Sequence, residues 1–447
     1  MAEPGAAAGP TVVVRGGTVV DATGVRRADV LVRRGAVAEV GPDLGVPSGA
    51  TVLDAGGCLV APGLVDLHTH LRQPGAEEAE TVESGARAAA LGGFTAVVAM
   101  PNTDPPVDCA AVARQVLALG AGAPCAVAVA GAITVGRAGE RLAPMAELAG
   151  LGVRLFTDDG TGLQDVAVMR RALEYARGLG VTLAQHCEDE GLAAGGHMHE
   201  GAWSSRLGVP GVPAEAEELM VARDIALARL TGGRIHFLHL STARSAALVA
   251  AARAEGLAVT AEVTPHHLSL THAELAGYDP VFKVNPPLRT DADVAALRRA
   301  CAAGTVDAVA TDHAPHPPER KETTLDAAPP GMLGLQTAVP VVFDALCGDG
   351  ASGAGLGVAG VLGLLSWGPA AVAGLDRAHG GEQGGPVEPG APANLCVIDP
   401  AATWEVDPAR LASRSRNTPW AGRVLTGRVR HTVLRGEPVV VDAEARR

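Results

Sequence analysis

The stretch LVDLHTHLRQPG, Leu64 to Gly75, joins an apolar run directly to two histidines and an arginine. If the run is a β-strand, residues two apart face the same way, so Asp66, His68 and His70 can point at one spot. Imidazoles that converge at the end of a strand are typical metal ligands. An isolated pair of histidines at this spacing also occurs on exposed edge strands, so the rest of the chain has to decide between a metal site and an ordinary surface strand.

Seven further apolar runs follow along the chain, and helical patterns lie between most of them. This alternation predicts parallel strands, and eight such units predict an α/β fold of the closed (β/α)₈ type, the TIM barrel. A doubly wound open sheet is the alternative, but no G-x-G-x-x-G motif follows the first strand to support a dinucleotide fold. The eight runs are residues 64–68, 95–100, 125–131, 153–157, 181–185, 235–239, 258–263 and 307–311.

The two ends of the chain have a different pattern, with short alternating runs separated by turn residues. Residues 11–60 predict hairpin strands, and the C-terminal part returns to the same style after a Gly- and Pro-rich linker at 379–394. We therefore expect residues 1–61 and 384–447 to form one small composite domain, a β-sandwich. Residues 62–383 would then form the catalytic barrel.

Composition excludes some partners. The formal net charge of the 447 residues is −13, which argues against nucleic acid or an anionic membrane as the main partner. A local site can still bind an anionic small molecule. Hydrophobic residues make up 47% of the chain but aromatic residues only 2%, so Ala, Val and Leu must fill the core.

The cellular compartment is predicted from cysteine usage and from the absence of targeting signals. Seven scattered cysteines without a C-x-x-C motif indicate reduced thiols in a cytoplasmic protein. The first ten residues lack the basic and apolar regions of a secretion signal. Residues 350–375 carry no charge, but glycines, serines and Pro369 interrupt them, so we expect a loop and a buried helix rather than a membrane span.

Imidazole, carboxylate and other polar side chains gather where the predicted strands end. If the barrel closes, four histidines and two aspartates meet around one axis. Such nitrogen and oxygen ligands suit two divalent metals, and zinc fits best. The pattern predicts a binuclear metallohydrolase. The polar residues at the strand ends are His68, His70, Arg72, Asn102, Asp158, Asp159, His186, His239, Asn285, Asp312, His313 and His316.

Several of these assignments stay open at the level of sequence. Asp158 and Asp159 compete for one ligand position. His266 and His267 are adjacent, and adjacent strand residues face opposite ways, so a structural or supporting role is favoured for both. His313 is expected to support Asp312 rather than to bind metal.

At this point the motifs resemble a known family. DLHTHLRQPG, MPNTDPP, FTDDG, HCEDE, TPHHL, KVNPPLR, ATDHAPH and SRNTPWAGRVLTGRV together look like a dihydroorotase of the type I bacterial class, within the amidohydrolase superfamily. The resemblance runs from about Gly16 to Pro438. It implies zinc-dependent, reversible cyclisation of N-carbamoyl-L-aspartate to L-dihydroorotate in pyrimidine biosynthesis. It also raises the expectation of a homodimer and of association with aspartate transcarbamoylase.

The resemblance implies roles for individual residues. Two zinc ions per subunit would be held, one by His68 and His70 and the other by His186 and His239. Asp159 would bridge the ions, and Asp312 would bind metal and transfer a proton. The substrate contacts that the resemblance implies are His70, Arg72, Asn102, Asn285, His316, Pro330 and Gly331, and the loop Pro317–Met332 would close over the site.

Two other functions compete. Hydantoinases, dihydropyrimidinases and allantoinases are related cyclic amidases that usually bridge their metals with a carboxylated lysine. The chain has lysines only at 283 and 321, so none is available at the fourth strand. An inactive homologue that serves as a scaffold for aspartate transcarbamoylase would have lost metal ligands, whereas all six are present.

Overall fold

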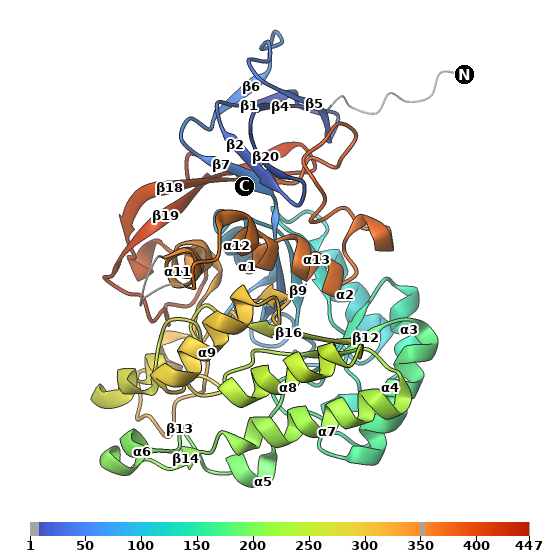
Figure 1. Cartoon of the computed structure of the whole chain (residues 1–447), viewed down its shortest axis with the longest axis vertical. Coiled ribbons are helices and arrows are strands. Elements are labelled where there is room, and N and C mark those ends of the chain that lie inside the picture. Colours follow the sequence, from blue (N-terminus) through green and yellow to red (C-terminus); the bar gives the residue numbers. More distant parts are fainter. Residues whose placement is uncertain (1–8, 349–353, 447) are drawn as a thin grey trace.

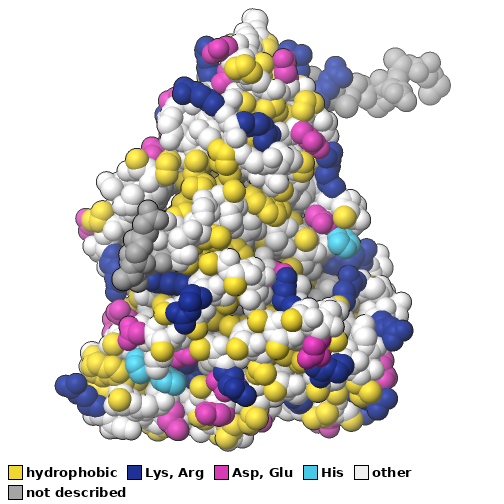
Figure 2. Space-filling view, in the orientation of Figure 1, with side chains coloured by type: hydrophobic (Ala, Val, Ile, Leu, Met, Phe, Trp, Pro, Cys, Tyr) yellow, Lys and Arg dark blue, Asp and Glu magenta, His cyan; other side chains and the backbone are white. Residues whose placement is uncertain are grey.

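The structure, a computed structural model, describes residues 9–348 and 354–446. The chain forms a barrel of strands and helices with a smaller β region stacked against one end of it (Figure 1). Figure 2 shows acidic and basic side chains interspersed over the visible face, without a continuous basic patch. In the described residues, no helix is both long and apolar enough to cross a membrane.

Eight parallel strands form the barrel. Two parallel bridges close the ring, because Gly131 pairs with Phe156 at one seam and Thr69 pairs with His313 at the other. Each strand coincides with one of the apolar runs in the sequence, so the predicted (β/α)₈ barrel is confirmed. One sheet holds β8 (Leu64–Thr69), β9 (Phe94–Ala99) and β10 (Ala126–Val129), and the other holds β11 (Leu155–Phe156), β12 (Thr182–Gln185), β15 (Ile235–Phe237), β16 (Val259–Val263) and β17 (Ala308–Val309).

Helices between the strands cover the outside of the ring (Figure 1). Their starts carry the expected caps: Thr290 accepts a hydrogen bond from the backbone of Asp293 at the start of α9. The helices are α1 (Val82–Leu91), α2 (Ala110–Gly120), α3 (Met145–Gly150), α4 (Val166–Leu179), α7 (Glu215–Thr231), α8 (Ala243–Ala254), α9 (Asp291–Ala302), α11 (Ala338–Cys347), α12 (Val358–Leu365) and α13 (Trp367–Val372). Short elements lie in the loops: α5 (Glu190–Ala193), β13 (Met198–His199), α6 (Ala202–Leu207), β14 (Gly211–Val212) and α10 (Pro318–Lys321).

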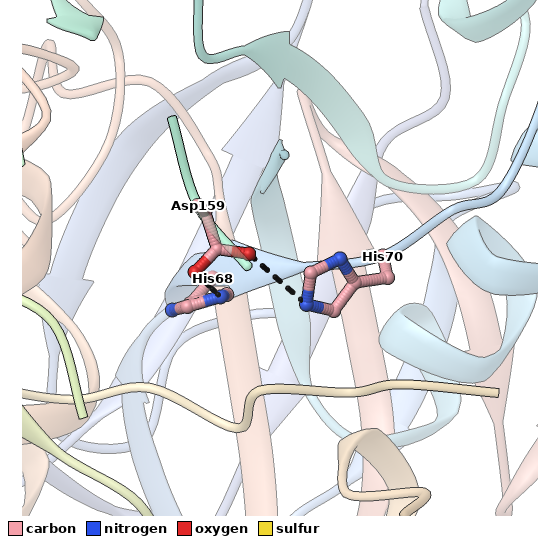
Figure 3. A group of neighbouring side chains, drawn as sticks. All are labelled: His68, His70 and Asp159. Atoms are coloured by element: carbon pink, nitrogen blue, oxygen red, sulfur yellow. Dashed lines mark ion pairs between the residues drawn. The ribbon is translucent and has the colours of Figure 1, made fainter. Parts of the chain in front are cut away.

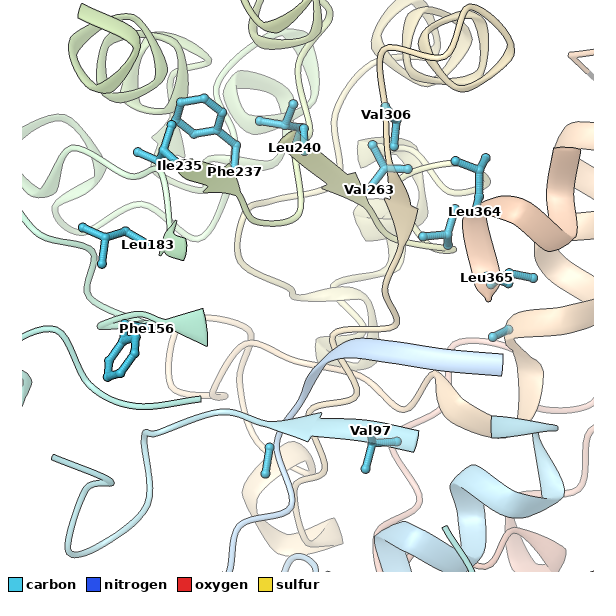
Figure 4. Packing of buried hydrophobic residues seen from close by; sticks show 14 of the residues in the cluster. Val97, Phe156, Leu183, Ile235, Phe237, Leu240, Val263, Val306, Leu364 and Leu365 are labelled. Atoms are coloured by element: carbon cyan, nitrogen blue, oxygen red, sulfur yellow. The ribbon is translucent and has the colours of Figure 1, made fainter. Parts of the chain in front are cut away.

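Alternation along the strands divides the core into two layers. Phe156, Leu183 and Phe237 belong to the cluster that packs between strands and helices (Figure 4). Their neighbours in sequence, such as Leu155 and Ala184, belong to a separate cluster that also contains residues of β8, β9 and β17. This second cluster fills the barrel interior with small side chains, as the low aromatic content requires.

Both ends of the chain contribute to the β region. Its larger sheet has the order β21 (Glu444–Ala445), β20 (Glu437–Val441), β19 (Val424–Leu434), β18 (Leu395–Glu405), β7 (Leu59–Pro62), β2 (Thr18–Asp21), β3 (Gly24–Arg27). The smaller sheet has the order β5 (Ala36–Gly41), β4 (Asp29–Arg33), β1 (Val12–Arg15), β6 (Thr51–Asp54). The N- and C-terminal parts join where β7 pairs with β18. The domain boundaries at 61/62 and 383/384 stay a prediction.

One part of the hairpin prediction was wrong. β1 and β2 lie in different sheets, and β1 pairs in parallel with β6. The chain turns between them at Gly16, which has a positive φ of 81°, and a Cβ on Gly17 would lie 2.5 Å from the side chain of Val60. The two glycines therefore serve a tight crossing between sheets, which a sequence pattern does not distinguish from a hairpin turn. The β2–β3 and β4–β5 pairs are antiparallel hairpins as predicted.

The uncharged stretch 350–375 forms the helices α12 and α13 in its described part, while residues 350–353 lie outside the described residues. Val361, Leu362 and Leu365 of α12 are buried. The expected buried helix is therefore present.

The fold predicts that truncating two apolar side chains to alanine has very different effects on the free energy of unfolding. Phe156 is fully buried in β11, so Phe156→Ala should lower the free energy of unfolding by about 3–5 kcal/mol through lost contacts and a cavity. Leu219 of α7 is 56% exposed, and Leu219→Ala should change it by less than about 0.5 kcal/mol. Urea denaturation of both variants measures the difference. Similar values for the two would contradict the placement of Phe156 in the core.

Candidate metal centre

Five of the predicted ligands converge at the C-terminal end of the barrel. His68 and His70 come from β8 and the turn after it, and Asp159, His186 and His239 follow β11, β12 and β15. Two groups of three potential ligands are present, and Asp159 belongs to both. The first group adds His68 and His70 to Asp159, and the second adds His186 and His239. Figure 3 shows the first group, with the carboxylate of Asp159 facing both imidazoles.

The distances place the Asp159 carboxylate between the imidazoles. Its Oδ1 lies 3.4 Å from Nε2 of His68 and 3.5 Å from Nδ1 of His186, and its Oδ2 lies 3.6 Å from Nε2 of His70. Nε2 of His239 lies 3.7 Å from Oδ1 and 2.9 Å from Nδ1 of His186. Oδ1 therefore faces imidazoles of both groups and Oδ2 faces His70, so the two groups share this carboxylate, as they would share a bridging ligand.

Asp312 joins the cluster from the strand that closes the ring. Its Oδ1 lies 3.0 Å from Nε2 of His70 and 3.5 Å from Nε2 of His68. The backbones of Asp312 and His239 both have a positive φ, 46° and 32°, which is uncommon outside glycine. Such backbone strain is typical of functional sites, where the surrounding structure has to maintain it.

The cluster has the charge and the unpaired atoms that a cation would complement. Nε2 of His68 is buried without a hydrogen-bond partner among the described residues. Burial lowers the pKa of His68, but the carboxylates of Asp159 and Asp312 outweigh this effect and raise it well above its usual range. Burial raises the pKa of Asp159, but the neighbouring imidazoles hold it well below its usual range. An imidazole that holds a proton so firmly occupies an anionic environment, so these residues fit divalent metal ions.

A buried glutamate that the sequence argument missed fixes the orientation of His68. Nδ1 of His68 donates to Oε1 of Glu262 at 3.0 Å, and His236 donates to the other oxygen at 3.1 Å. Burial raises the pKa of Glu262, but these two histidines lower it to about 2. A ring that donates through Nδ1 presents the Nε2 lone pair to the cluster. The signal in the sequence was a single glutamate in the apolar run AVTAEV of β16.

Asp66 has a different position from its neighbours His68 and His70. Its carboxylate accepts hydrogen bonds from the backbone of His68 and from the backbone and hydroxyl of Thr311. It therefore connects β8 to the segment that carries Asp312. Full burial is the main reason why the pKa of Asp66 is raised to about 7.

The structure also shows where the side chains lie whose roles the sequence left open. The carboxylate of Asp158 accepts hydrogen bonds from the backbone of Ile133 and Thr134, so it faces the preceding loop. His313 lies 3.3 Å from Glu80 and accepts from the backbone of Gly334. His267 bonds Thr264 and the carbonyl of Pro286, whereas Nε2 of His266 is buried without a partner in the described residues. None of these side chains belongs to either potential ligand group.

A cavity of about 190 Å³ opens beside the cluster. Arg72 lines it, with Nε donating to the carbonyl of Pro315 and with no ion pair in the described part of the chain. Burial lowers the pKa of Arg72 only to about 10, so the guanidinium stays charged near neutral pH. All predicted site residues except His68 line the cavity: His70, Arg72, Asn102, Asp159, His186, His239, Asn285, Asp312, His316, Pro330 and Gly331.

Several lining side chains are held by neighbours. Asn102 accepts from Nδ1 of His70 at 3.0 Å, and Asn285 donates to Glu188 at 3.1 Å. Nε2 of His316 lies 2.8 Å from the carbonyl of Pro330 and can donate to it. Burial and the positive charge of Arg72 lower the pKa of His316 to about 3, so its imidazole is neutral at neutral pH.

Comparison with known proteins agrees with this geometry. The family model described as dihydro-orotase-like matches residues 57–245. The chain is 48% identical over 432 residues to a dihydroorotase of Pelotomaculum thermopropionicum, covering 96% of this chain and 98% of the relative. It is 49% identical over 419 residues to a dihydroorotase of Streptomyces coelicolor, covering 93% of this chain and 96% of the relative.

Solved structures of related amidases share the fold. An L-hydantoinase from Arthrobacter aurescens superimposes with a TM-score of 0.85 at 25% identity and covers 97% of each chain. A dihydropyrimidinase from Brevibacillus agri superimposes with a TM-score of 0.82 at 23% identity, covering 98% of this chain and 96% of the other. The predicted resemblance in sequence is confirmed by the two full-length relatives, and the chain belongs to the dihydroorotase family of cyclic amidohydrolases.

Proposed function

We propose that the chain catalyses the zinc-dependent, reversible cyclisation of N-carbamoyl-L-aspartate to L-dihydroorotate in de novo pyrimidine biosynthesis. The observation that carries the proposal is a charged guanidinium, that of Arg72, without an ion-pair partner in the described residues, in the same cavity as two groups of metal ligands. A substrate with a carboxylate beside a cyclic amide would use both features. The names of the full-length relatives, both dihydroorotases, agree with this substrate.

In this proposal His68 and His70 would hold one zinc ion and His186 and His239 the other, and Asp159 belongs to both groups of ligands. Asp312 would be the sixth ligand. When bound, the two ions would polarise the ring carbonyl and make a water molecule more acidic. Glu262 keeps the Nε2 lone pair of His68 directed at its ion.

The substrate is oriented by the other cavity residues. Arg72 binds the exocyclic carboxylate in two parallel hydrogen bonds, Asn102 donates to the same group, and His316 binds it by turning its one N–H away from the carbonyl of Pro330. Asn285 holds the ring, because its bond to Glu188 uses an N–H and leaves the amide oxygen to accept from a ring N–H. Pro330 and Gly331 contribute their backbone beside His316, whose Nε2 lies 2.8 Å from the carbonyl of Pro330.

Asp312 moves the proton. In hydrolysis it accepts a proton from the attacking water and delivers it to the ring nitrogen as the amide bond breaks. Neighbouring histidines, His68 first among them, outweigh burial and hold the pKa of Asp312 well below its usual range, so it begins in the ionised form that a base requires. In synthesis the same group takes the proton from the attacking ureido nitrogen.

A sister cyclic amidase is the second candidate, because the solved neighbours include hydantoinases. Their family usually uses a carboxylated lysine, and here neither lysine is near the ligand groups. Nζ of Lys283 donates to the carbonyls of Leu325 and Asp326, and Nζ of Lys321 donates to three other carbonyls. An inactive scaffold is disfavoured because all six ligands are retained. The homodimer, the association with aspartate transcarbamoylase and the cytoplasmic location stay predictions.

The deciding experiment is a dihydroorotate hydrolysis assay on protein with a measured zinc content, with hydantoin and allantoin as competing substrates. The proposal expects two zinc ions per subunit and turnover of dihydroorotate only. Turnover of hydantoin in preference to dihydroorotate would support the sister amidases, and metal-loaded protein without any turnover would support the scaffold.

Glu262→Gln should weaken metal binding, because an amide cannot accept from His68 and His236 with the same strength. Loss of a residue that orients a ligand typically costs about 10–100-fold in metal affinity. Competition with a chelator measures it, and Glu255→Gln, an exposed change at the C-terminal end of α8, is the control. Equal affinities for the two variants would remove Glu262 from the site.

The two adjacent aspartates should behave differently. Asp159→Ala should lose one or both metals because it removes the shared carboxylate. Asp158→Ala should retain both metals and lower stability, because the carboxylate of Asp158 accepts hydrogen bonds from the backbone of Ile133 and Thr134.

Zinc alone should reactivate the metal-free protein, without bicarbonate. A requirement for CO₂ would show that a carboxylated lysine forms the bridge.

Arg72→Lys should weaken binding despite the preserved charge, because an ammonium cannot reproduce the bidentate fork. We expect a rise in KM for dihydroorotate equivalent to about 1.5–3 kcal/mol, with unchanged metal content. An unchanged KM would mean that the carboxylate is held elsewhere.

Asp312→Asn should slow both directions at least about 100-fold, because an amide can neither accept nor deliver the proton. Ring closure consumes a proton, so synthesis is best measured below about pH 7 and hydrolysis above about pH 8. Turnover close to that of the wild type in either direction would exclude Asp312 from the proton transfer.

A further inference from the structure

The connection between β18 and β19 returns from the β region to the catalytic face of the barrel. We call residues 411–418 of this connection the strap. Its backbone and side chains bond the barrel at several points: Ala412 N–H donates to Gln336, Ser415 Oγ donates to the carbonyl of Ala79, and Arg414 N–H donates to Glu80. The strap is therefore fixed to the loops after β8 and β17 rather than lying free on the surface.

Asn417 is the residue of the strap that reaches the cavity wall. Its side-chain amide makes three hydrogen bonds. Nδ2 donates to the carbonyls of Ala314 at 3.0 Å and Gly331 at 3.1 Å, and Oδ1 accepts from the backbone N–H of His316 at 3.1 Å. Its own carbonyl accepts from the backbone of Leu333 at 3.0 Å. The residue is only 5% exposed, so these groups have no access to bulk water as an alternative partner.

These bonds join the two ends of one loop. Ala314 and His316 begin the loop that follows β17, and Gly331 ends it. The ends lie so close that a Cβ on Gly331 would be 2.7 Å from Cβ of Ala314. Three residues that line the cavity, Ala314, His316 and Gly331, are therefore held from behind by one amide of a distant chain segment.

We propose that Asn417 is a positioning residue for substrate binding, which fixes the carboxylate-binding wall of the cavity through His316 and Gly331. The inference rests on the proposed function, because the wall matters only if an anionic substrate occupies the cavity. Asn417 belongs to neither group of metal ligands and to none of the residues that line the cavity. Its loss should therefore affect binding rather than metal content.

The kinetic test compares two buried asparagines. Asn417→Ala should raise KM for dihydroorotate at least about 10-fold, which corresponds to about 1.4 kcal/mol, with kcat within about threefold and an unchanged zinc content. Asn394→Ala is the matched control. Asn394 is 4% exposed and also bonds backbone groups through its side chain, but it lies at the opposite end of β8, where its carbonyl accepts from Gly63.

Asn417→Asp separates positioning from general packing. This variant keeps the shape and the acceptor oxygen but places a carboxylate against the carbonyls of Ala314 and Gly331. KM should be raised at pH 8 and should recover in part toward pH 6, because a protonated carboxyl group can donate one of the lost bonds. A purely structural defect would give a KM that does not depend on pH in this way.

Hydrogen–deuterium exchange of residues 317–332 in zinc-loaded protein without substrate gives a readout that does not need activity. Asn417→Ala should speed exchange in this segment at least about 10-fold, and Asn394→Ala should not. An unchanged KM, or a fall in kcat accompanied by loss of zinc, would overturn the proposal. If the wild type turns over no dihydroorotate, the proposed function fails, and exchange alone then decides whether Asn417 holds the loop.

Discussion

The seam between β8 and β17 is the constraint on which the rest of the site depends. There the ring closes through the pair Thr69–His313, and the buried carboxylate of Asp66 binds both sides of the seam. Because one strand supplies two imidazoles and the other supplies Asp312, closing the ring also brings together the first half of the proposed metal centre. The remaining candidate ligands follow three other strands, and their side chains meet there because all strands of such a barrel end at the same face.

Much of the fold and of the ligand set could be predicted from the sequence. Apolar runs mark the strands whatever their partners, and a polar residue two positions beyond an inward-facing one points to the same axis, as His186 does after Ala184. His68 and His239 break this rule, because each directly follows an inward-facing leucine, Leu67 or Leu238, and His239 reaches the cluster through a positive φ. The tight crossing at Gly16 and the support from Glu262 depend on which elements become neighbours, and a single sequence does not encode that in any local pattern.

The β region contributes more than stability to the barrel. Both ends of the chain pair in one sheet, and from that sheet a connection returns to the catalytic face, where it bonds the loops after β8 and β17. Part of the cavity wall is thus held in place by a segment about a hundred residues away in the sequence.

The two lysines of the chain are both buried, with Nζ of each bonded to backbone carbonyls. Every side-chain cation on the surface, other than histidine, is therefore a guanidinium, which keeps its charge at any pH that the fold survives. Alkaline solution does not discharge such a surface, so the repulsion and solubility of the molecule change little between neutral pH and pH values where lysine-rich proteins lose their positive charge. Reagents that couple to primary amines find few targets on this surface, and five of the seven thiols are buried, which leaves carboxylates as the practical handles for attaching the protein to a support.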